Sequence, residues 1–260
     1  MDEGFTTYAE DLVSAYYKQQ KSNPVKGNEL SAAPSGSGAG VDLPLYHADT
    51  YAGYFNLVKS GLEEPLTTHA DHFNTNFAYA RAAYSKGGVF LAQLGYIISD
   101  SLRDKTLLEY YNQWKFKHPN ANDFMRVAEK VSGIQLDWYK EYWVNTTKTI
   151  DYKIDSLWEQ GGKTKIRLRM AGQIPMPLDV LLQYKNGTKA TVYIPQFSMF
   201  GEKPAENTTP RFVQEPWKWT HPTYVFEVES SLMNISSVEI DPTWRMADIN
   251  RSNNKLELKW

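Results

Sequence analysis

The sequence predicts an α+β protein in two modules, with helices first and an antiparallel β-sandwich after them. In the first part apolar residues recur at helical spacing, whereas after Asn145 they alternate with a period of two. Two glycine-containing turns, at 160–163 and 185–188, separate alternating runs as β-hairpin turns do. We therefore predict a helical module over residues 1–148 and a β-sandwich over residues 149–260.

The predicted helices follow one another along the first module. Residues 3–20 carry apolar side chains at helical spacing, whereas residues 23–44 are rich in Pro, Gly and Ser and predict a surface loop. Further helices are predicted over 46–60, 77–99, 105–116, 121–131 and 135–144. The breaks between the last three are His118-Pro119-Asn120 and Ser132-Gly133.

The second module contains six runs that read as strands. They are predicted over residues 150–157, 164–170, 178–184, 189–194, 223–228 and 238–240. Several short strands with turn signals between them are typical of a β-sandwich.

Composition excludes several classes of function. The 28 basic and 30 acidic residues give a net charge of -2 without a long run of either sign, which argues against a nucleic-acid partner. No apolar stretch is long enough for a membrane segment, and no signal peptide is visible. The sequence has no cysteine, so a metal would be held by His and carboxylate side chains. A periplasmic or secreted location is slightly favoured over a cytoplasmic one, and the oligomeric state is left open.

The histidines do not form a recognisable metal site in this chain. None of the five lies in an H-E-x-x-H pattern. His69 and His72 are close in sequence, but they occupy a segment with turn chemistry, and we expect a solvated loop there rather than a ligand pair.

Two short segments carry the functional signal. The first is Asp2-Glu3-Gly4-Phe5, where Glu3 at the mouth of a helix is by itself a carboxylate that caps the positive end of the helix dipole. The second runs from Tyr79 to the motif Tyr84-Ser85-Lys86-Gly87-Gly88, and its two tyrosines are by themselves half-buried core residues.

In this order the two segments together resemble the aminopeptidase N family of zinc metallopeptidases, the gluzincins that include leukotriene hydrolase. In that family an H-E-x-x-H helix precedes Asn-Glu-Gly-Phe, whose Glu is the third zinc ligand, and a Tyr-x-Lys-Gly-Gly motif follows. The resemblance implies that Glu3 is a zinc ligand, that Tyr84 is catalytic, and that Tyr79 is a candidate for the wall of the substrate cleft. It also implies that residues 1–148 are the remainder of a thermolysin-like catalytic domain.

The sequence departs from the family pattern in ways that limit the activity of this chain. Asp2 stands where the family usually has Asn, and the H-E-x-x-H segment and the motif that recognises the substrate amine are absent from these 260 residues. We therefore expect a zinc-dependent peptidase in the complete enzyme, with peptide as substrate. This chain alone is expected to be inactive and zinc-free, because a single carboxylate does not hold zinc. Exopeptidase and endopeptidase action stay open.

The alternative is a non-catalytic module that binds peptide or carbohydrate. Trp217, Trp219, Tyr224 and Trp244 would then form an exposed aromatic surface on the sandwich, and Glu3 would only cap its helix. An in-frame H-E-x-x-H segment upstream of Met1 would favour the enzyme over the binding module.

Overall fold

The computed structural model describes residues 2–22 and 46–259, with the side chains of 2–18 and 46–259. The predicted loop at 23–44 lies outside the described residues. The chain divides into two compact units, Met1–Gln93 and Leu94–Trp260, and the division falls inside a helix. Each unit is described separately below.

The first unit is helical. It contains α1 (Asp2–Ser22), α2 (Ala48–Ser60), the short η1 (Ala70–His72), α3 (Asn76–Ala80), the π-helical η2 (Arg81–Lys86) and the start of α4 (Gly87–Ile98). The helices predicted over 3–20 and 46–60 are confirmed as α1 and α2. The helix predicted over 77–99 is present as α3, η2 and α4 in direct succession.

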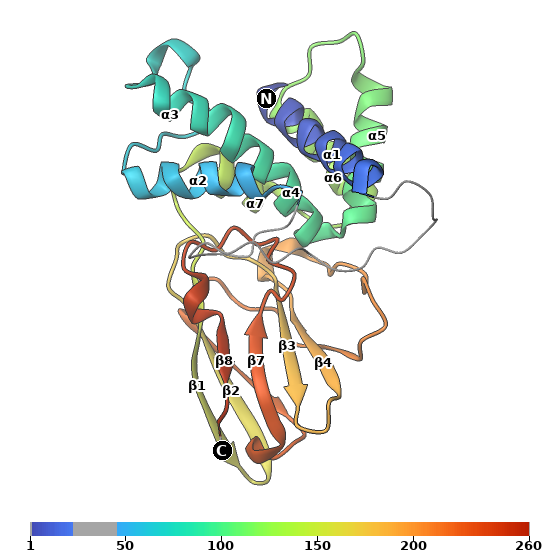
Figure 1. Cartoon of the computed structure of the whole chain (residues 1–260), viewed down its shortest axis with the longest axis vertical. Coiled ribbons are helices and arrows are strands. Elements are labelled where there is room, and N and C mark those ends of the chain that lie inside the picture. Colours follow the sequence, from blue (N-terminus) through green and yellow to red (C-terminus); the bar gives the residue numbers. More distant parts are fainter. Residues whose placement is uncertain (1, 23–45, 260) are drawn as a thin grey trace. The chain divides into compact units, whose positions relative to one another are not determined.

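Contacts between these helices explain how the first unit holds together. Leu57 of α2 is fully buried with Ala78 and Ala82, and Leu66 and Phe73 pack against them. Figure 1 shows α2 alongside α3 and α4, in agreement with the contacts between α2 and η2. The small side chains of Ala78 and Ala82 let the helix axes approach closely.

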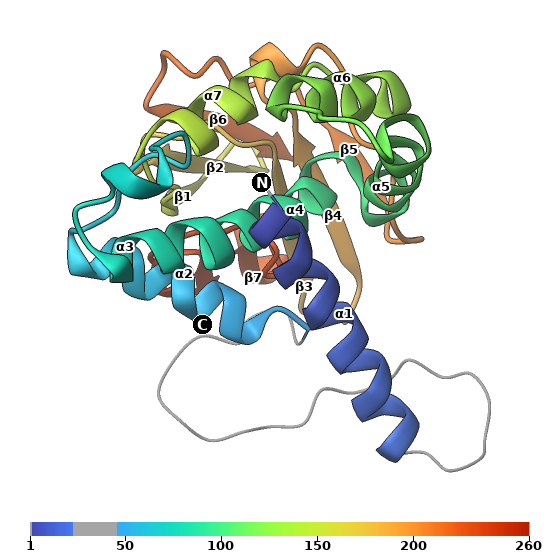
Figure 2. The ribbon, with the colours of Figure 1, turned by 90° about the horizontal axis from the view of Figure 1, so that it is seen from above.

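Helix α1 is tied to α2 by a polar cluster. Asp11 accepts a hydrogen bond from Thr50 Oγ1 at 2.7 Å, and its Oδ2 atom lies 2.8 Å from His47 Nδ1. Tyr8 stacks on the His47 ring with centroids 5.0 Å apart. Figure 2 shows the amino-terminal end of α1 crossing the start of α4.

The second unit begins with the end of α4 and three further helices, α5 (Asp100–Trp114), α6 (Ala121–Ser132) and α7 (Asp137–Asn145). Asn120 and Asp123 form a capping box at the start of α6, and Gly133 ends it with a φ of 71°. The three helices predicted over 105–116, 121–131 and 135–144 are confirmed, although α5 begins earlier, after the Ser99 cap.

The strands of the second unit form two sheets. One has the order β1-β2-β6, with β1 (Tyr152–Gln160), β2 (Lys163–Met170) and β6 (Thr223–Val228). The other has the order β5-β4-β3-β7-β8, with β5 (Arg211–Val213), β4 (Lys189–Ile194), β3 (Leu178–Tyr184), β7 (Ile235–Ile240) and β8 (Lys255–Glu257). Alternate residues of β2 are buried, as expected of a strand with one face on the core.

The six predicted strands are all present, and the mixed helix-and-sheet class is confirmed. One detail was wrong, because β5 pairs with β4 in parallel, so the larger sheet is not purely antiparallel. Strand β1 contacts β7 and β8, which places the two sheets against each other (Figure 1). The predicted turns at 160–163 and 185–188 connect β1 to β2 and β3 to β4, and Gly161, Gly162 and Gly187 adopt the positive φ that these turns require.

The change from helices to strands lies between Asn145 and Tyr152, around residue 148. The compact units nevertheless divide earlier, so α5, α6 and α7 belong to the unit that contains the sheets. The two-module partition at residue 148 stays a prediction. None of the described helices has the length and hydrophobicity that a transmembrane span requires.

Candidate functional site

The candidate site is in the first unit, at the amino-terminal end of α1. Glu3 lies in the first turn of α1, which begins at Asp2, and its side chain is half-buried. Tyr79 donates a hydrogen bond from its hydroxyl to Glu3 Oε1 at 3.2 Å. The structure therefore brings Tyr79 and Glu3 together from helices that are distant in sequence.

The hydrogen bond has electrostatic consequences for both partners of Glu3. The bond to Glu3 and the negative charge of that carboxylate raise the pKa of Tyr79, so its phenol stays protonated and remains a donor. A side-chain hydrogen bond with Glu3 lowers the pKa of Asp2. Tyr79 also packs edge-on against Phe73, with ring centroids 5.6 Å apart.

Tyr84 lies in η2, the π-helical turn between α3 and α4. Such turns are rare and occur often at functional sites, because the extra residue redirects side chains out of the regular helical ladder. The Tyr84 side chain is 44% exposed, and its phenol is near enough to Tyr79 to influence the pKa of that residue. Tyr84 thus belongs to the same surface as Tyr79 and Glu3.

The four residues after Tyr84 are each held by a specific contact. Two of them are glycines at close approaches. A Cβ atom on Gly4 would lie 2.7 Å from the carbonyl carbon of Gly87, so the Glu3-Gly4 and Gly87-Gly88 backbones touch. A Cβ atom on Gly88 would lie 2.8 Å from Thr50 Cγ2. Gly4 and Gly87 are therefore required for the two segments to meet, and Gly88 lets the same helix approach Thr50 of α2.

Ser85 and Lys86 point into the protein. Ser85 is buried against the backbone of Gly53 on α2. Lys86 is 0% exposed and its Nζ atom lies 2.7 Å from Glu63 Oε1, in a side chain that is 6% exposed. Burial raises the pKa of Glu63 and lowers the pKa of Lys86, and their attraction opposes both shifts. This buried ion pair fixes the end of η2 and leaves Tyr84 outside.

The described residues supply one candidate metal ligand to this site. Among residues 2–22 and 46–259, no three His, Cys, Asp or Glu side chains converge as a metal-binding group. A catalytic zinc takes three protein ligands, so Glu3 does not form a zinc site with its described neighbours. His69 and His72 are exposed, with ring centroids 5.3 Å apart, and His69 Nδ1 accepts a hydrogen bond from Asp71 N.

The expectation of an exposed aromatic surface on a binding module was wrong for Trp217. Trp217 is only 4% exposed, because it stacks on Tyr224 and packs edge-on against Tyr152. Trp244 lies beneath the Arg251 guanidinium, 4.6 Å from ring centroid to Cζ, and Trp219 is exposed. Trp217 is therefore not available to an exposed aromatic surface.

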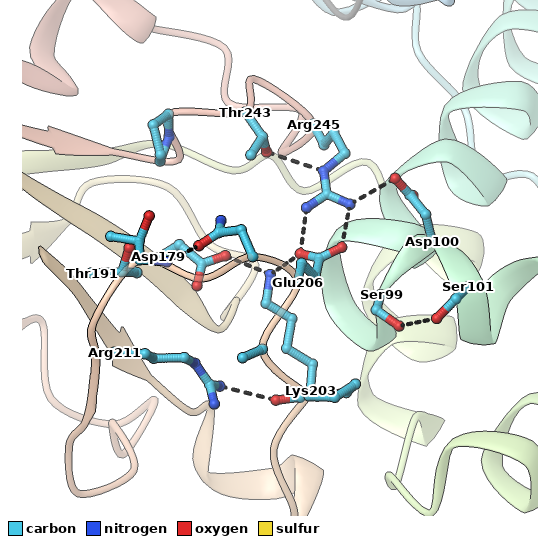
Figure 3. Close-up of a pocket in the computed structure, with 15 residues that line it drawn as sticks. Ser99, Asp100, Ser101, Asp179, Thr191, Lys203, Glu206, Arg211, Thr243 and Arg245 are labelled. Atoms are coloured by element: carbon cyan, nitrogen blue, oxygen red, sulfur yellow. Dashed lines mark hydrogen bonds and ion pairs between the residues drawn. The ribbon is translucent and has the colours of Figure 1, made fainter. Parts of the chain in front are cut away.

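Sequence reasoning missed a polar pocket of about 710 Å³ in the second unit. Its lining includes three cations and three anions, Lys203, Arg211, Arg245, Asp100, Asp179 and Glu206, shown in Figure 3. They come from five separate segments, so no local motif could have indicated them.

The charges in this pocket are matched internally. Glu206 accepts hydrogen bonds from Arg245 at 2.6 and 2.9 Å and from Lys203 Nζ at 3.0 Å. Burial alone would raise the pKa of Glu206, but the bonds and charges of Arg245 and Lys203 lower it to about 2. Asp100 binds the same Arg245 at 3.1 Å. The network joins α5, the loop before β5 and the turn after β7.

Comparison with known proteins gives a similarity to solved structures alone. No protein-family model matches the chain, and no curated protein matches it. A solved structure of Legionella pneumophila aminopeptidase A in complex with aspartic acid is similar to it at 11% identity and a TM-score of 0.46. That similarity covers 80% of this chain and 24% of the Legionella chain, so this chain spans about a quarter of that protein's length. A similarity at this level does not identify a family.

Proposed function

We propose that this chain supplies part of the active site of a zinc-dependent metallopeptidase, aminopeptidase-like, that hydrolyses peptide bonds. The observation that carries the proposal is the meeting of the two motif segments. Tyr79 binds Glu3, and the Gly4 and Gly87 backbones touch, so the proposed ligand and the proposed catalytic tyrosine share one surface. A helix cap would require neither contact.

Glu3 suits a zinc ligand in its chemistry. It is a half-buried carboxylate held in one orientation by a hydrogen bond, and metal-ligating carboxylates are commonly fixed in this way. The described residues alone do not complete the site. We therefore assign the two imidazole ligands and the general base to an H-E-x-x-H segment of the complete enzyme, where the zinc would act as a Lewis acid. The chain by itself is proposed to be zinc-free and inactive.

The other two residues then have distinct roles. Tyr79 is a positioning residue, because its hydroxyl donates to the Glu3 carboxylate and stays protonated while that carboxylate is charged. Tyr84 is the catalytic residue of this chain. Its exposed hydroxyl would donate a hydrogen bond to the carbonyl oxygen of the substrate as that oxygen gains negative charge.

Metal content tests the assignment of Glu3. In the complete enzyme, Glu3→Gln is expected to reduce bound zinc from about one ion per chain to nearly none, because one of three ligands is lost. The matched control is Glu10→Gln, which changes an exposed carboxylate on the same helix. Equal zinc content in the two variants would remove Glu3 from the metal site.

Metal analysis of the 260-residue chain is a separate test. We expect no stoichiometric zinc and no peptide hydrolysis. Stoichiometric zinc in this chain would contradict the proposal, because it would require a complete ligand set within these residues. In that case His69 and His72 would be the first residues to substitute in a search for the zinc ligands.

A further inference from the structure

The polar pocket of the second unit contains one cation whose counter-charge is distant. Lys203 Nζ lies 3.0 Å and Arg245 Nη2 lies 2.6 Å from Glu206 Oε2, so both cations are tightly paired. Arg211, which lines the same pocket, has a single described carboxylate within 4.0 Å, that of Glu202. The Glu202 side chain is half-exposed, so water weakens this attraction. Arg211 therefore gives the pocket a positive charge that the described residues offset only weakly.

The Arg211 guanidinium is held in one orientation and still keeps donors for a ligand. Its Cζ atom lies 4.2 Å from the centroid of the buried Tyr193 ring, and its Nη2 atom donates to Lys203 O at 2.9 Å (Figure 3). This is the only hydrogen bond from the side chain to a described residue, whereas a guanidinium has five N–H donors. The side chain is 16% exposed. Most of its donors are therefore available to a ligand at a fixed and largely buried position.

Two threonines line the pocket together with Arg211. Thr191 of β4 is the direct partner of Arg211 in the pairing of β4 with β5, and its amide donates to Pro210 O at 2.8 Å. Thr209 precedes β5, and its amide donates to Asn207 Oδ1 at 2.9 Å. Neither threonine hydroxyl forms a hydrogen bond with a described residue. These backbone contacts fix the two residues and leave both hydroxyls able to donate to a ligand.

The backbone around the pocket is strained at three positions. Ser99 lines the pocket with a φ of 84° and a ψ of 151°, a conformation that is adopted almost only by glycine. Asp241 and Trp244 enclose the lining residues Pro242 and Thr243 and have φ values of 46° and 58°. Strained backbone is costly, and it is concentrated at sites that bind ligands. The strain supports a role for this pocket beyond packing.

We propose that Arg211, Thr191 and Thr209 bind the carboxylate of a small organic acid. A planar guanidinium binds a carboxylate through two parallel N–H···O bonds, and the hydroxyls add further donors. One weakly paired cation balances a ligand with a single negative charge. Asp179 and Glu206 line the same pocket and would repel a ligand with more negative charge, such as inorganic phosphate.

The remainder of the pocket indicates what kind of acid it accepts. Its volume of about 710 Å³ lies within the range of sites for small organic ligands and exceeds what a bare ion needs. Pro204, Ala205 and Pro242 give it apolar wall. The ligand is therefore an acid with an apolar substituent, which a free amino acid and the carboxyl end of a peptide both provide.

NMR titration of N-acetyl-leucine with the 260-residue chain, observed on the ligand, tests the site. We expect a Kd of about 1 mM, the affinity of an average ligand of this size. N-acetyl-leucine amide lacks only the carboxylate and should bind about tenfold more weakly or less, because the charge-assisted hydrogen bonds are lost. Leucine, titrated in parallel, distinguishes a free amino acid from the carboxyl end of a peptide, and binding of either acid supports the proposal. The titration requires neither zinc nor peptide hydrolysis, so its outcome is independent of the proposed peptidase function.

Two variants and a control complete the test. Arg211→Gln should raise the Kd of the acid about 10- to 100-fold, and Thr191→Val, which keeps the shape of the side chain, about 3- to 10-fold. The control Arg126→Gln changes an exposed cation of α6 outside the pocket and should leave the Kd unchanged. Circular dichroism checks that each variant is folded, and Thr191→Val decides the test if Arg211→Gln is not.

Four results would overturn the proposal. The first is the absence of binding by either acid at about 20 mM, well above the expected Kd. The second is equal binding of the acid and its amide, which would mean that the carboxylate is not recognised. The third is tighter binding of inorganic phosphate than of either acid. The fourth is an unchanged Kd in the folded variants at Arg211 and Thr191, which would place the ligand elsewhere on the chain.

Discussion

The buried ion pair behind Tyr84 leads to a large stability change when its cation is removed. Lys86→Met keeps the length of the side chain and its apolar stem but removes the charge. Glu63 then remains in a site where its side chain is 6% exposed, without the Nζ atom that lay 2.7 Å away. Breaking a buried pair in this way costs about 3–5 kcal/mol. For a chain of this size that corresponds to a fall in Tm of about 6–20 °C.

The loss of stability caused by Lys86→Met should be larger at high pH than at low pH. In the variant, burial without a cation raises the native-state pKa of Glu63 further above its unfolded value. The native state then binds a proton more tightly than the unfolded state, so stability falls as the pH rises through the native pKa. Urea unfolding followed by circular dichroism should show a larger loss at about pH 8 than at about pH 5.

The double variant Lys86→Met/Glu63→Gln separates the pair from the packing. It leaves no unpaired charge, so its stability should return to within about 1 kcal/mol of the parent, because an apolar replacement of a buried pair is often neutral. A single variant Lys86→Met that loses less than about 1 kcal/mol at pH 8 would refute the reasoning. It would mean that Glu63 reaches solvent or another cation.

Two further predictions concern the contacts of each unit. Gly4→Ala should destabilise the chain by about 1–3 kcal/mol, because its Cβ atom would meet the Gly87 backbone at 2.7 Å. The control Gly201→Ala, with its nearest neighbours at 3.5 Å, should stay within about 0.5 kcal/mol, and equal unfolding midpoints would contradict the close approach. Glu206 has a pKa of about 2 against an unfolded value of 4.5, so it should contribute about 3 kcal/mol to the free energy of unfolding. This contribution is present above pH 4.5 and is lost as the pH falls toward 2. Glu206→Gln should remove this pH dependence of the free energy of unfolding between pH 6 and 3, whereas the exposed control Glu215→Gln should keep it. The same slope of unfolding free energy against pH in Glu206→Gln and the parent would exclude the pairing of Glu206 with Arg245 and Lys203.

Local patterns were sufficient for most of the fold. The strands Leu178–Tyr184 and Lys189–Ile194 were predicted with the bounds that the structure shows, because Asn186-Gly187 fixes a hairpin between two alternating runs. Strands β5 and β8 were missed. Each has only three residues, which is too short for a periodic signal, and each is joined to the preceding strand, its partner, by an irregular connection rather than a tight turn. The π-helical turn at Arg81–Lys86 was also missed, because its residues are as compatible with a regular α-helix as with a π-helix.

The candidate site was predictable only in part. Resemblance of the two motifs indicated Glu3 and Tyr84, but the hydrogen bond from Tyr79 to Glu3 depends on how helices far apart in sequence pack. The network around Glu206 has no sequence signal, since its partners come from separate segments.

Turnover of the complete enzyme carrying Tyr84→Phe tests the central proposal most directly. The change removes one hydroxyl from an exposed side chain, so fold and zinc content should be unchanged. One preorganised donor to a developing oxyanion is worth about 3–4 kcal/mol, which predicts a fall in kcat of about two to three orders of magnitude. The control Tyr111→Phe, at an exposed tyrosine of α5, should keep the activity of the parent. A kcat for Tyr84→Phe within about threefold of the parent would contradict a catalytic role for Tyr84.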